Sequence, residues 1–456
     1  MPLQKNQVLT LRVERLSSDG SGVAHSPDGE TVFIPGAAPG DEARVRIVKD
    51  CKRYAFGILD EVLTPSPDRI PVDCAVAGPC GGCSLRHLDY AAELRAKQEN
   101  VADAFARIGG LDVPVLPIVG SPEVNRYRNK VQFPVGVDKS GKPCIGFYAG
   151  RTHRIVPCPD CRLQPGVLNE IGNALCAFFA EKGIQPYSEE TGRGLVRHIF
   201  LRRGAHSGQI MVCLVCTRAK LPSAEELCTR LKAQFAEITT ILLNVNAKNT
   251  NVILGTETHT LYGPGYIEDT LCGVPVQLGP LSFYQVNTLA AEQLYGIAAQ
   301  YAQLTPDDLL LDLYCGMGTI GLSMAAHCRE LIGVEIVPEA IESAKANAVR
   351  MGADVAAKSR FFCADAGQAA TRLAAEGLHP DIVMLDPPRK GCDEATLSAV
   401  VRMSPRRVVY VSCNPATAAR DAAWLEQNGY HAEKVQPVDL FPRTRHCECV
   451  LSFSKV

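Results

Sequence analysis

The pattern that most limits how this chain can fold is an alternation of apolar runs and helical stretches, which starts near residue 283. DLLLDLYCG reads as a strand and MGTIGLSMAAHC as a helix, and the same order recurs in ELIGVEIV and PEAIESAKANAVRMG. Strands separated by helices of this length predict a doubly wound parallel sheet. The last two apolar runs, AEKVQPVDLF and CECVLSFSKV, predict a hairpin at one edge of that sheet.

Glycines and acidic residues stand where these predicted strands end. The first strand runs into G-x-G-x-x-G at 316–321, a formal match to the dinucleotide fingerprint, although glycines there also serve any tight turn. Asp312 lies just before them, where a carboxylate suits an amino acid cofactor but opposes a pyrophosphate, which favours S-adenosylmethionine over NAD. Glu335, where an acid accepts hydrogen bonds from ribose hydroxyls, ends the second strand. A single acid there is usually a helix cap, but Asp365 and Asp386 end the next two strands and complete a rim compatible with a sulfonium cation.

Cys413 stands between a predicted strand and the residues that end that strand. A run of β-formers at 408–411 ends at Ser412, and Asn414-Pro415 breaks it. This is the edge at which open α/β sheets keep their reactive groups. Most of the nineteen cysteines lie singly in apolar runs, where a free thiol behaves as a small hydrophobe. Taken alone, Cys413 is therefore more simply interpreted as an inert thiol than as a nucleophile.

Length and composition predict a multidomain globular protein of the cytoplasm. At ~150 residues a domain, 456 residues suggest about three domains. Apolar runs stay well short of the ~20 residues of a membrane span, and the N-terminus lacks the apolar core of a signal peptide. The odd number of cysteines argues against a disulfide framework. We expect no membrane partner and see no sign of an obligate protein partner.

Three regions differ in their local pattern. Residues 1–63 alternate in short strands separated by turn signals and predict a small β-barrel. Residues 64–281 begin with a Pro-rich linker and then mix strands and helices, and residues 282–456 form the predicted parallel sheet. We therefore expect a barrel, a mixed α+β central domain and a C-terminal α/β domain.

Basic residues gather in the central region, although the net charge of −2 argues against a nucleic-acid coat over the whole surface. Such clusters can neutralise phosphates, and the plain alternative is a solvated basic face. The basic residues are Arg126, Arg128, Lys130, Lys139, Lys142, Arg151 and Arg154, followed by Arg193, Arg197, Arg202 and Arg203.

Six motifs in a fixed order carry a resemblance to a known family. YRNKVQFPVG and FYQVN precede DLYCGMGTIGL, LDPPRKG, VSCNPAT and PRTRHCEC. Together they resemble the bacterial RNA uracil-5-methyltransferases, particularly those that act on 23S ribosomal RNA. The predicted barrel, with SSDGSGVA and PGAAPGDE, resembles a TRAM domain, an OB-like RNA-binding module. The resemblance implies a Rossmann-like, S-adenosylmethionine-dependent methyltransferase domain at the C-terminal end.

The resemblance also implies roles for single residues. Cys413 matches the family's nucleophile and Glu448 its proton-abstracting base. The chain departs from the pattern at Cys447, where many members carry a small or apolar residue. The expected cofactor-binding residues, from this match and from the strand ends, are Gln285, Tyr314, Gly316, Glu335, Asp365 and Asp386.

The chemistry of uracil supports these two roles from another direction. Uracil C5 is too weak a nucleophile to attack a methyl donor, but a thiolate that adds to C6 turns C5 into an enolate carbon. A base must later remove the C5 proton so that the thiol can leave, and the uracil must first leave its stack. If Glu448 is not that base, His446 is the next candidate, because it lies two residues away on the same face of the predicted strand.

A second set of cysteines predicts a metal centre. Cys74, Cys80 and Cys83 stand in C-x5-C-G-G-C, where the glycines let two thiolates converge, and Cys158 and Cys161 both offer a fourth ligand. From the residues alone, zinc and iron–sulfur stay open because both take four cysteines. The resemblance implies a 4Fe–4S cluster with Cys161 as the fourth ligand. We expect it to serve folding or RNA placement.

Several readings therefore remain at this stage. The leading one is methylation of a 23S ribosomal RNA uridine, with transfer RNA as the other possible substrate. An NAD-dependent oxidoreductase would leave the SCNP and HCE motifs without a role. A non-catalytic RNA-binding protein would leave the strand-end acids unexplained.

Overall fold

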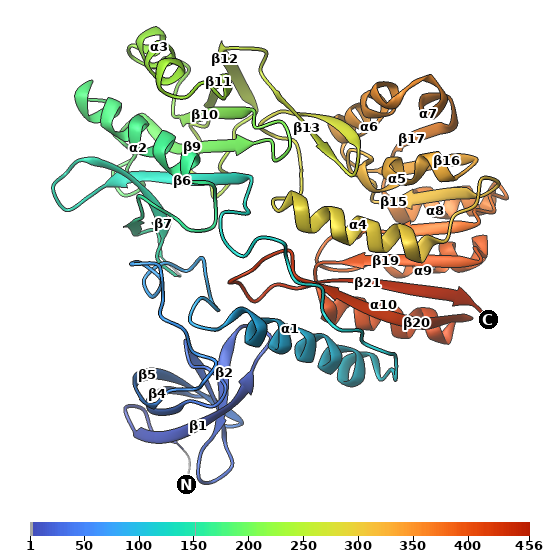
Figure 1. The fold of residues 1–456 in the computed structure, drawn as a ribbon, viewed down its shortest axis with the longest axis horizontal. Coiled ribbons are helices and arrows are strands. Elements are labelled where there is room, and N and C mark those ends of the chain that lie inside the picture. Colours follow the sequence, from blue (N-terminus) through green and yellow to red (C-terminus); the bar gives the residue numbers. More distant parts are fainter. Residues whose placement is uncertain (1–2, 151) are drawn as a thin grey trace.

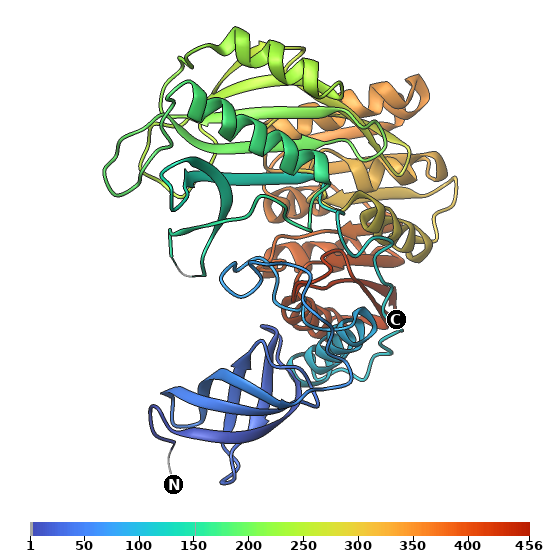
Figure 2. The same cartoon turned by 60° about the vertical axis from the view of Figure 1, so that its left-hand side comes forward.

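The computed structural model describes residues 3–150 and 152–456, which form a barrel, a central sheet and a C-terminal sheet (Figure 1). The barrel projects from the rest of the molecule at the N-terminal end (Figure 2). It closes in the order β1-β2-β3-β5-β4, and side chains at alternate positions, such as Val32 and Ile34, fill its interior. The strands are β1 (Val8–Leu16), β2 (Ser21–His25), β3 (Thr31–Pro35), β4 (Glu42–Asp50) and β5 (Tyr54–Thr64).

A helix after the barrel connects it to the C-terminal sheet. α1 (Tyr90–Ala104) begins at Asp89, whose side chain accepts a hydrogen bond from the Ala91 N–H, and continues as a π-helical turn, η1 (Phe105–Gly109). Gly110 ends it in the left-handed region with φ of 62°. The last turn of the helix is therefore wider than that of an α-helix.

A buried charge network joins α1 to the loop that precedes the last strand. Lys97 Nζ donates to Glu93 Oε1 at 2.7 Å, to Asp439 Oδ1 at 2.8 Å and to the Phe441 carbonyl at 3.2 Å. The two carboxylate side chains are fully buried, and the Lys97 side chain is 2% exposed. The Arg443 N–H donates to Glu93 Oε1 at 2.7 Å, so the loop is fixed at two places.

The central sheet is covered on both faces. Its order is β12-β11-β10-β9-β6-β7-β8, and β10, IMVCLVC, is buried at every position. α2 (Gly166–Glu181) and α3 (Ala224–Gln234) lie over one face, while Phe200 and Met211 on the other join the core of the C-terminal sheet. The strands are β6 (Lys130–Val137), β7 (Pro143–Tyr148), β8 (Ile155–Pro157), β9 (Val196–Arg203), β10 (Ile210–Cys216), β11 (Ile238–Val245) and β12 (Glu257–Tyr262).

The C-terminal sheet has the predicted doubly wound order, β17-β16-β15-β18-β19-β21-β20. β15 to β19 run parallel, and β21 pairs antiparallel with both β19 and β20. The chain order reverses between β15 and β18, so a crevice is expected there at the carboxyl ends of the strands. The strands are β15 (Leu309–Leu313), β16 (Glu330–Glu335), β17 (Ser359–Cys363), β18 (Ile382–Leu385), β19 (Arg407–Ser412), β20 (Tyr430–Val438) and β21 (Glu448–Lys455).

Helices cover both faces of this sheet, which explains why an inner strand such as β18, IVML, is apolar and buried at every position. Leu310 and Met384 point into one core and Leu311 and Val383 into the other. A small hairpin of β13 (Ile267–Leu271) and β14 (Val274–Leu278) leads in from the central sheet. The helices are α4 (Thr288–Ala302), α5 (Thr319–Met324) with η2 (Ala325–His327), α6 (Pro338–Met351), α7 (Ala353–Lys358), α8 (Ala366–Ala375), α9 (Glu394–Met403) and α10 (Pro415–Gln427).

The edge hairpin of β20 and β21 is confirmed, with one addition. The later strand, β21, lies inside, next to β19, and β20 forms the edge. Val115 and Val119, from the segment after η1, make single bridges to β20. Among the described residues, no helix is both long and apolar enough to cross a membrane.

Candidate active site

Cys413 and Glu448 meet at the carboxyl edge of the C-terminal sheet. Cys413 follows β19 directly, and α10 begins two residues later with Asn414 as its N-cap. Glu448 is the first residue of β21, and Ser412 pairs with Cys449 in the antiparallel register of these strands. One further step along that register brings Cys413 beside Glu448.

Burial and shared charge perturb the acids and the thiol of this edge. Burial, reinforced by the charge of Asp386, raises the pKa of Glu448 to about 8. Burial raises the pKa of Asp386 to about 7. The pKa of Cys413 rises to about 11 because of burial and the two carboxylates, while the Arg389 guanidinium opposes the rise. Perturbed groups that gather in this way are typical of a catalytic site.

The perturbed acids and thiol of this edge would all respond to a positively charged ligand. A positive ligand beside Asp386, Glu448 and Cys413 would favour the charged form of all three groups at once. Arg389 already acts in that direction on Cys413 and Glu448 from the loop after β18. The edge is thus suited to a positively charged ligand and to a thiol that ionises when that ligand is bound.

The glycine turn after β15 is held by two carboxylates. Gly316, with φ of 54°, donates its N–H to Glu335 Oε2 at 3.2 Å, and the Gly321 N–H donates to Asp312 Oδ2 at 3.0 Å. Gly318 caps α5 with φ of 79°, a conformation that a side chain would strain. Asp312 is 1% exposed, and burial raises its pKa to about 8. The Asp312 carboxylate therefore fixes the turn from the buried side. Glu335 also lies at the carboxyl edge of the sheet.

Gln285 joins the same edge through a tyrosine that sequence reasoning missed. The Tyr295 hydroxyl on α4 shares hydrogen bonds with Gln285 and Thr319, and burial followed by the charge of Asp386 raises the pKa of Tyr295. Tyr295 lies inside a helix without a recognisable motif, so its sequence gave no signal. Arg389 belongs to the LDPPRKG motif, but the motif alone does not indicate a role for it.

Tyr314 and Asp365 make other contacts. Tyr314, with φ of 67°, has its hydroxyl 3.3 Å from Thr396 Oγ1 on α9. Asp365 caps α8 and accepts a hydrogen bond from the Gln368 N–H at 3.1 Å. The helix-cap role considered for such an acid thus applies to Asp365, and its binding to a cofactor stays a prediction.

His446 and Cys447 precede β21 and lie outside it, so the expectation that His446 shares a strand face with Glu448 is wrong. The His446 ring packs edge-on against Phe441 with 6.0 Å between ring centroids, and burial followed by Arg389 lowers its pKa. The thiol of Cys447 is buried and lies 3.3 Å from the Glu448 carbonyl oxygen.

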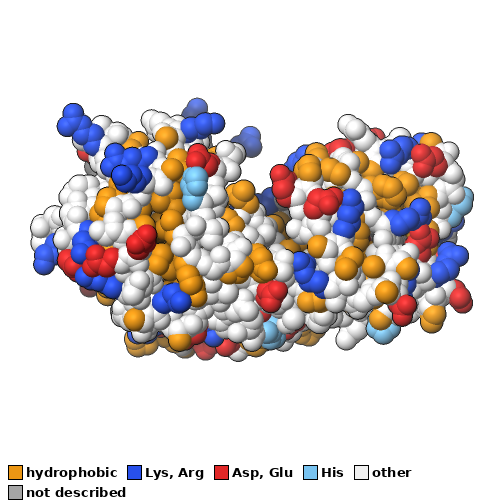
Figure 3. Space-filling view, turned by 90° about the horizontal axis from the view of Figure 1, so that it is seen from above, with side chains coloured by type: hydrophobic (Ala, Val, Ile, Leu, Met, Phe, Trp, Pro, Cys, Tyr) orange, Lys and Arg blue, Asp and Glu red, His pale blue; other side chains and the backbone are white. Residues whose placement is uncertain are grey.

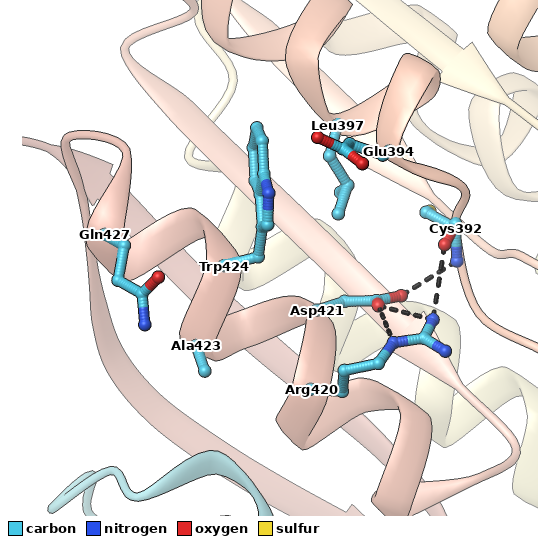
Figure 4. A pocket seen from close by; sticks show the side chains of 8 residues that line it. All are labelled: Cys392, Glu394, Leu397, Arg420, Asp421, Ala423, Trp424 and Gln427. Atoms are coloured by element: carbon cyan, nitrogen blue, oxygen red, sulfur yellow. Dashed lines mark hydrogen bonds and ion pairs between the residues drawn. The ribbon is translucent and has the colours of Figure 1, made fainter.

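The loop 387–393, which we call the arginine loop because it carries Arg389, is held from α10. Arg420 Nη2 donates to the Lys390 carbonyl at 3.0 Å. It also donates to the Cys392 carbonyl at 3.2 Å, and the Cys392 N–H donates to Asp421 Oδ2 at 2.8 Å (Figure 4). Asp421 also accepts from the Arg420 Nε–H at 2.8 Å. Beside this clamp is a pocket of about 400 Å³, with Trp424 on its wall.

The five cysteines of the predicted metal centre lie within electrostatic reach of one another. Burial raises the pKa of Cys80, and the charges of Cys161 and Cys74 add to the rise. Burial and the charges of Cys161 and Cys80 raise the pKa of Cys83. The Cys158 thiol donates a hydrogen bond to Cys161, which lowers the pKa of Cys161. Within residues 3–150 and 152–456, however, no three potential ligands already stand in a metal-binding arrangement.

The contacts of the Arg86 side chain indicate whether an anionic cluster would fit among these thiols. Its side chain is 3% exposed and hydrogen-bonds Asp73 and Asn125 through Nη1 alone. Nε and Nη2 are buried and find no hydrogen-bond partner in the described part of the chain, although Cys83 lies beside the guanidinium. Buried guanidinium donors beside the Cys83 and Cys161 thiols suit a negatively charged metal–sulfur group.

The predicted basic residues do not all face the surface of the central domain. Arg197 and Arg202 are buried and donate to backbone carbonyls, and Arg151 lies outside the described residues. From above, Lys and Arg side chains stand on the lobe of the central sheet, and a hollow separates it from the lobe of the C-terminal sheet (Figure 3). Lys130, at the start of β6, has its pKa lowered to about 8 by burial and by Arg202 and Arg128. This concentration of positive charge favours a polyanionic substrate.

Known proteins match both ends of this architecture. Residues 2–59 match the TRAM domain, and residues 207–456, more than half of the chain, match the family described as tRNA (Uracil-5-)-methyltransferase. The fold and the acid-rimmed edge are those of an RNA methyltransferase. More specifically, the chain belongs to the tRNA (uracil-5-)-methyltransferase family. The NAD-dependent oxidoreductase and the non-catalytic RNA-binding protein are thereby set aside.

Relatives extend over the full chain. An uncharacterized RNA methyltransferase of Halalkalibacterium halodurans is 43% identical over 98% of this chain and 97% of its own length. One from Bacillus cereus is 41% identical over 100% of this chain and 98% of its own. The crystal structure of Pyrococcus abyssi tRNA (uracil-54, C5)-methyltransferase with S-adenosyl-L-homocysteine superposes with a TM-score of 0.77 at 26% identity, covering 98% of this chain and 100% of that one.

Proposed function

We propose that this protein methylates C5 of a uridine in 23S ribosomal RNA, with S-adenosylmethionine as methyl donor. The observation that carries the proposal is that Cys413 and Glu448 meet at the carboxyl edge of the sheet. Asp386 and Arg389 lie beside them. A thiol and a buried acid side by side are the two groups that the chemistry of uracil C5 requires.

The residues act in a fixed order. Cys413 gives up its proton to water, its Sγ adds to uracil C6, and the electron pair of the C5–C6 double bond passes toward the C4 carbonyl. S-adenosylmethionine would supply the methyl group as an electrophile: C5 would form the bond to the methyl as the bond from that methyl to the donor sulfur breaks, leaving S-adenosylhomocysteine. Glu448 in its ionised form then takes the C5 proton, the double bond re-forms and the bond between Sγ and C6 breaks, which returns the thiolate. Arg389 favours both anionic forms throughout.

The cofactor is proposed to lie along the strand ends. Glu335 would accept hydrogen bonds from the ribose hydroxyls, beside the glycine turn that begins at Gly316. Asp386 and Gln285 would surround the sulfonium side, where Tyr295 connects them. Tyr314 and Asp365 complete the proposed set from the neighbouring loops. The S-adenosyl-L-homocysteine bound to the Pyrococcus abyssi enzyme supports this ligand class.

We further propose a 4Fe–4S cluster held by Cys74, Cys80, Cys83 and Cys161. The mutual electrostatic influence of these thiols and the unpaired donors of Arg86 support it. Its role would be to tie the segment after the barrel to the loop between β8 and α2, because methyl transfer needs no electrons. Zinc bound by the same thiols is the alternative.

The choice between ribosomal and transfer RNA rests on different observations. The proposed cluster favours 23S ribosomal RNA through the family resemblance, whereas the full-length structural neighbour acts on transfer RNA. We place the protein in the cytoplasm, where its free thiols would stay reduced. We propose domain boundaries at 1–63, 64–281 and 282–456.

The test is mass spectrometry of 23S ribosomal and transfer RNA from a strain that lacks this gene and from the complemented strain. Loss of 5-methyluridine from one 23S fragment, restored by the wild type but not by Cys413→Ala, is the expected result. If 5-methyluridine disappears from transfer RNA instead, the transfer RNA alternative replaces the proposal.

A further inference from the structure

Three aromatic side chains lie together on the outside of the barrel: Phe33 on β3 and Tyr54 and Phe56 on β5, which we call the aromatic face. Val32 and Ala55, their neighbours in the sequence, are buried in the barrel interior. Because successive side chains of a strand point to opposite sides, the three rings point away from that interior. Phe33 pairs with Phe56 in the parallel register of β3 and β5, which brings the rings of the two strands together.

The three rings of the aromatic face contact one another. The ring centroids of Tyr54 and Phe56 are 5.6 Å apart, those of Phe33 and Tyr54 5.7 Å, and those of Phe33 and Phe56 5.8 Å. Tyr54 is 40% exposed, and Ile58, which follows on the same side of β5, is 47% exposed. Because the rings hold one another in place, the aromatic face is a preformed apolar surface in contact with water.

The rest of the chain leaves the aromatic face open. The barrel packs against α1 and the segment before it through Leu16, at the end of β1, and Ala38, in the loop after β3. Arg15 adds an ion pair with Asp103 of α1 at 3.0 Å. Within the described ranges, no residue of β5 belongs to this apolar contact. A cluster of apolar side chains that stays open on a folded protein is typical of an interaction site.

Basic residues line the aromatic face on one side: Lys49, Lys52 and Arg53, which we call the basic edge. Lys49 pairs with Phe56 across β4 and β5, and Lys52 and Arg53 lie in the turn directly before β5. All three are exposed, and their side chains have no hydrogen-bond or ion-pair partner in the part of the chain that the structure describes. Asp50 is the only acid among them in the sequence, and its Oδ1 accepts a hydrogen bond from the Lys52 N–H at 2.6 Å. Positive charge beside exposed aromatic rings matches a polyanion that itself carries flat rings, which is a nucleic acid strand.

We infer that the aromatic face stacks the bases of an unpaired stretch of the RNA substrate while the basic edge contacts its phosphates. The inference rests on the proposed function for its substrate and adds a second RNA contact, on the barrel, apart from the uridine at Cys413. Every base has a π-face, so this contact accepts any base sequence. A double helix already covers its base faces by stacking, so we expect the barrel to select unpaired RNA.

The test is fluorescence anisotropy with the full-length protein and two labelled oligomers of the same length. One is an oligouridine of about twenty nucleotides, which is longer than the site of one OB fold, and the other is its abasic ribose–phosphate counterpart. Tyr54→Leu should weaken oligouridine binding roughly five- to a hundredfold, the range for one stacked base, and should leave binding of the abasic oligomer unchanged. Tyr54→Phe is the matched control: it keeps the ring and should keep the wild-type affinity for both oligomers.

A second variant separates the phosphates from the bases. Replacing Lys52 and Arg53 together by glutamine should reduce the slope of log affinity against log salt by about 1.4, or 0.7 for each phosphate, with both oligomers alike. The inference is overturned if Tyr54→Leu, folded by circular dichroism, binds oligouridine as the wild type does or weakens both oligomers equally. An unchanged salt slope in the double variant would overturn it as well. Neither measurement needs a particular uridine or methyl donor, so a wrong ribosomal target would leave these results intact.

Discussion

Replacing Glu448 by glutamine is expected to stabilise the folded protein at alkaline pH far more than at acid pH. Folding raises the pKa of Glu448 from 4.5 to about 8, so the unfolded chain ionises this group more readily than the folded protein does. A carboxyl with a raised folded pKa destabilises the fold as pH rises from its unfolded to its folded pKa. Glutamine removes that dependence.

The size of the effect follows from the two pKa values. At 1.36 kcal/mol for each pH unit between 4.5 and about 8, the cost of burying Glu448 is on the order of 5 kcal/mol at pH 9 and about 1 kcal/mol at pH 5. The difference in unfolding free energy between Glu448→Gln and the wild type should therefore grow by about 4 kcal/mol between these pH values. Its absolute value also contains the new amide contacts, but its growth with pH does not.

Urea titrations at pH 5 and pH 9 would measure this difference. Trp424 is the single tryptophan of the chain and lies on α10, so its fluorescence reports unfolding of the C-terminal sheet. Glu433 on β20 is the matched control: burial alone would raise its pKa, but hydrogen bonds from Arg407 and Ser452 outweigh burial and lower it. The stability that Glu433 contributes is lost only as pH falls below 4.5, so Glu433→Gln should be less stable than the wild type by a nearly constant amount between pH 5 and pH 9. A flat or falling difference for Glu448→Gln would refute the reasoning.

Four other outcomes are expected. Glu448→Gln mixed with RNA and S-adenosylmethionine should give a slow covalent band on a denaturing gel, because elimination needs the base, and the Cys413→Ala, Glu448→Gln double variant should lack it; normal turnover without the band would assign the base elsewhere. Protein purified without oxygen should contain about four irons per chain and lose them in Cys80→Ser, whereas one zinc per chain would contradict the cluster. Glu335→Ala should weaken S-adenosylmethionine binding by about 1–3 kcal/mol in calorimetry, and unchanged affinity would remove it from the ribose site. Asp421→Asn should loosen the arginine loop and move the pH profile of Cys413 alkylation to higher pH; an unmoved profile would show that the clamp does not affect the thiol.

The C-terminal fold was predictable because its signals are local. Strand and helix periods, the glycines at 316–321 and the acids at strand ends all follow from short stretches. Cys413 and Glu448 could be named as a pair only through the resemblance, since their proximity depends on β21 inserting beside β19. Whether they act as nucleophile and base stays a prediction.

Other features of the site depend on contacts between distant segments and could not be read from a pattern. Tyr295 on α4 contacts Gln285, in the loop before α4, and Thr319 on α5. Asp312 holds the glycine turn because Gly321 packs against it. The displacement of His446 from the strand follows from the start of β21 at Glu448, a boundary that apolar runs locate only to within a few residues.

The lysine network between α1 and the loop before β21 has a consequence for how this protein can be cut. Asp439 would lose its buried cation in any fragment that begins after α1, and β20 would lose the bridges from Val115 and Val119. Although they precede the proposed boundary at 282, α1 and the segment 111–119 therefore pack with the C-terminal sheet, and the central sheet is inserted between them in the sequence. A minimal methyltransferase would be made by deleting that insertion and joining residue 119 to residue 283, which keeps Gln285, whereas truncation at residue 282 should yield an insoluble chain.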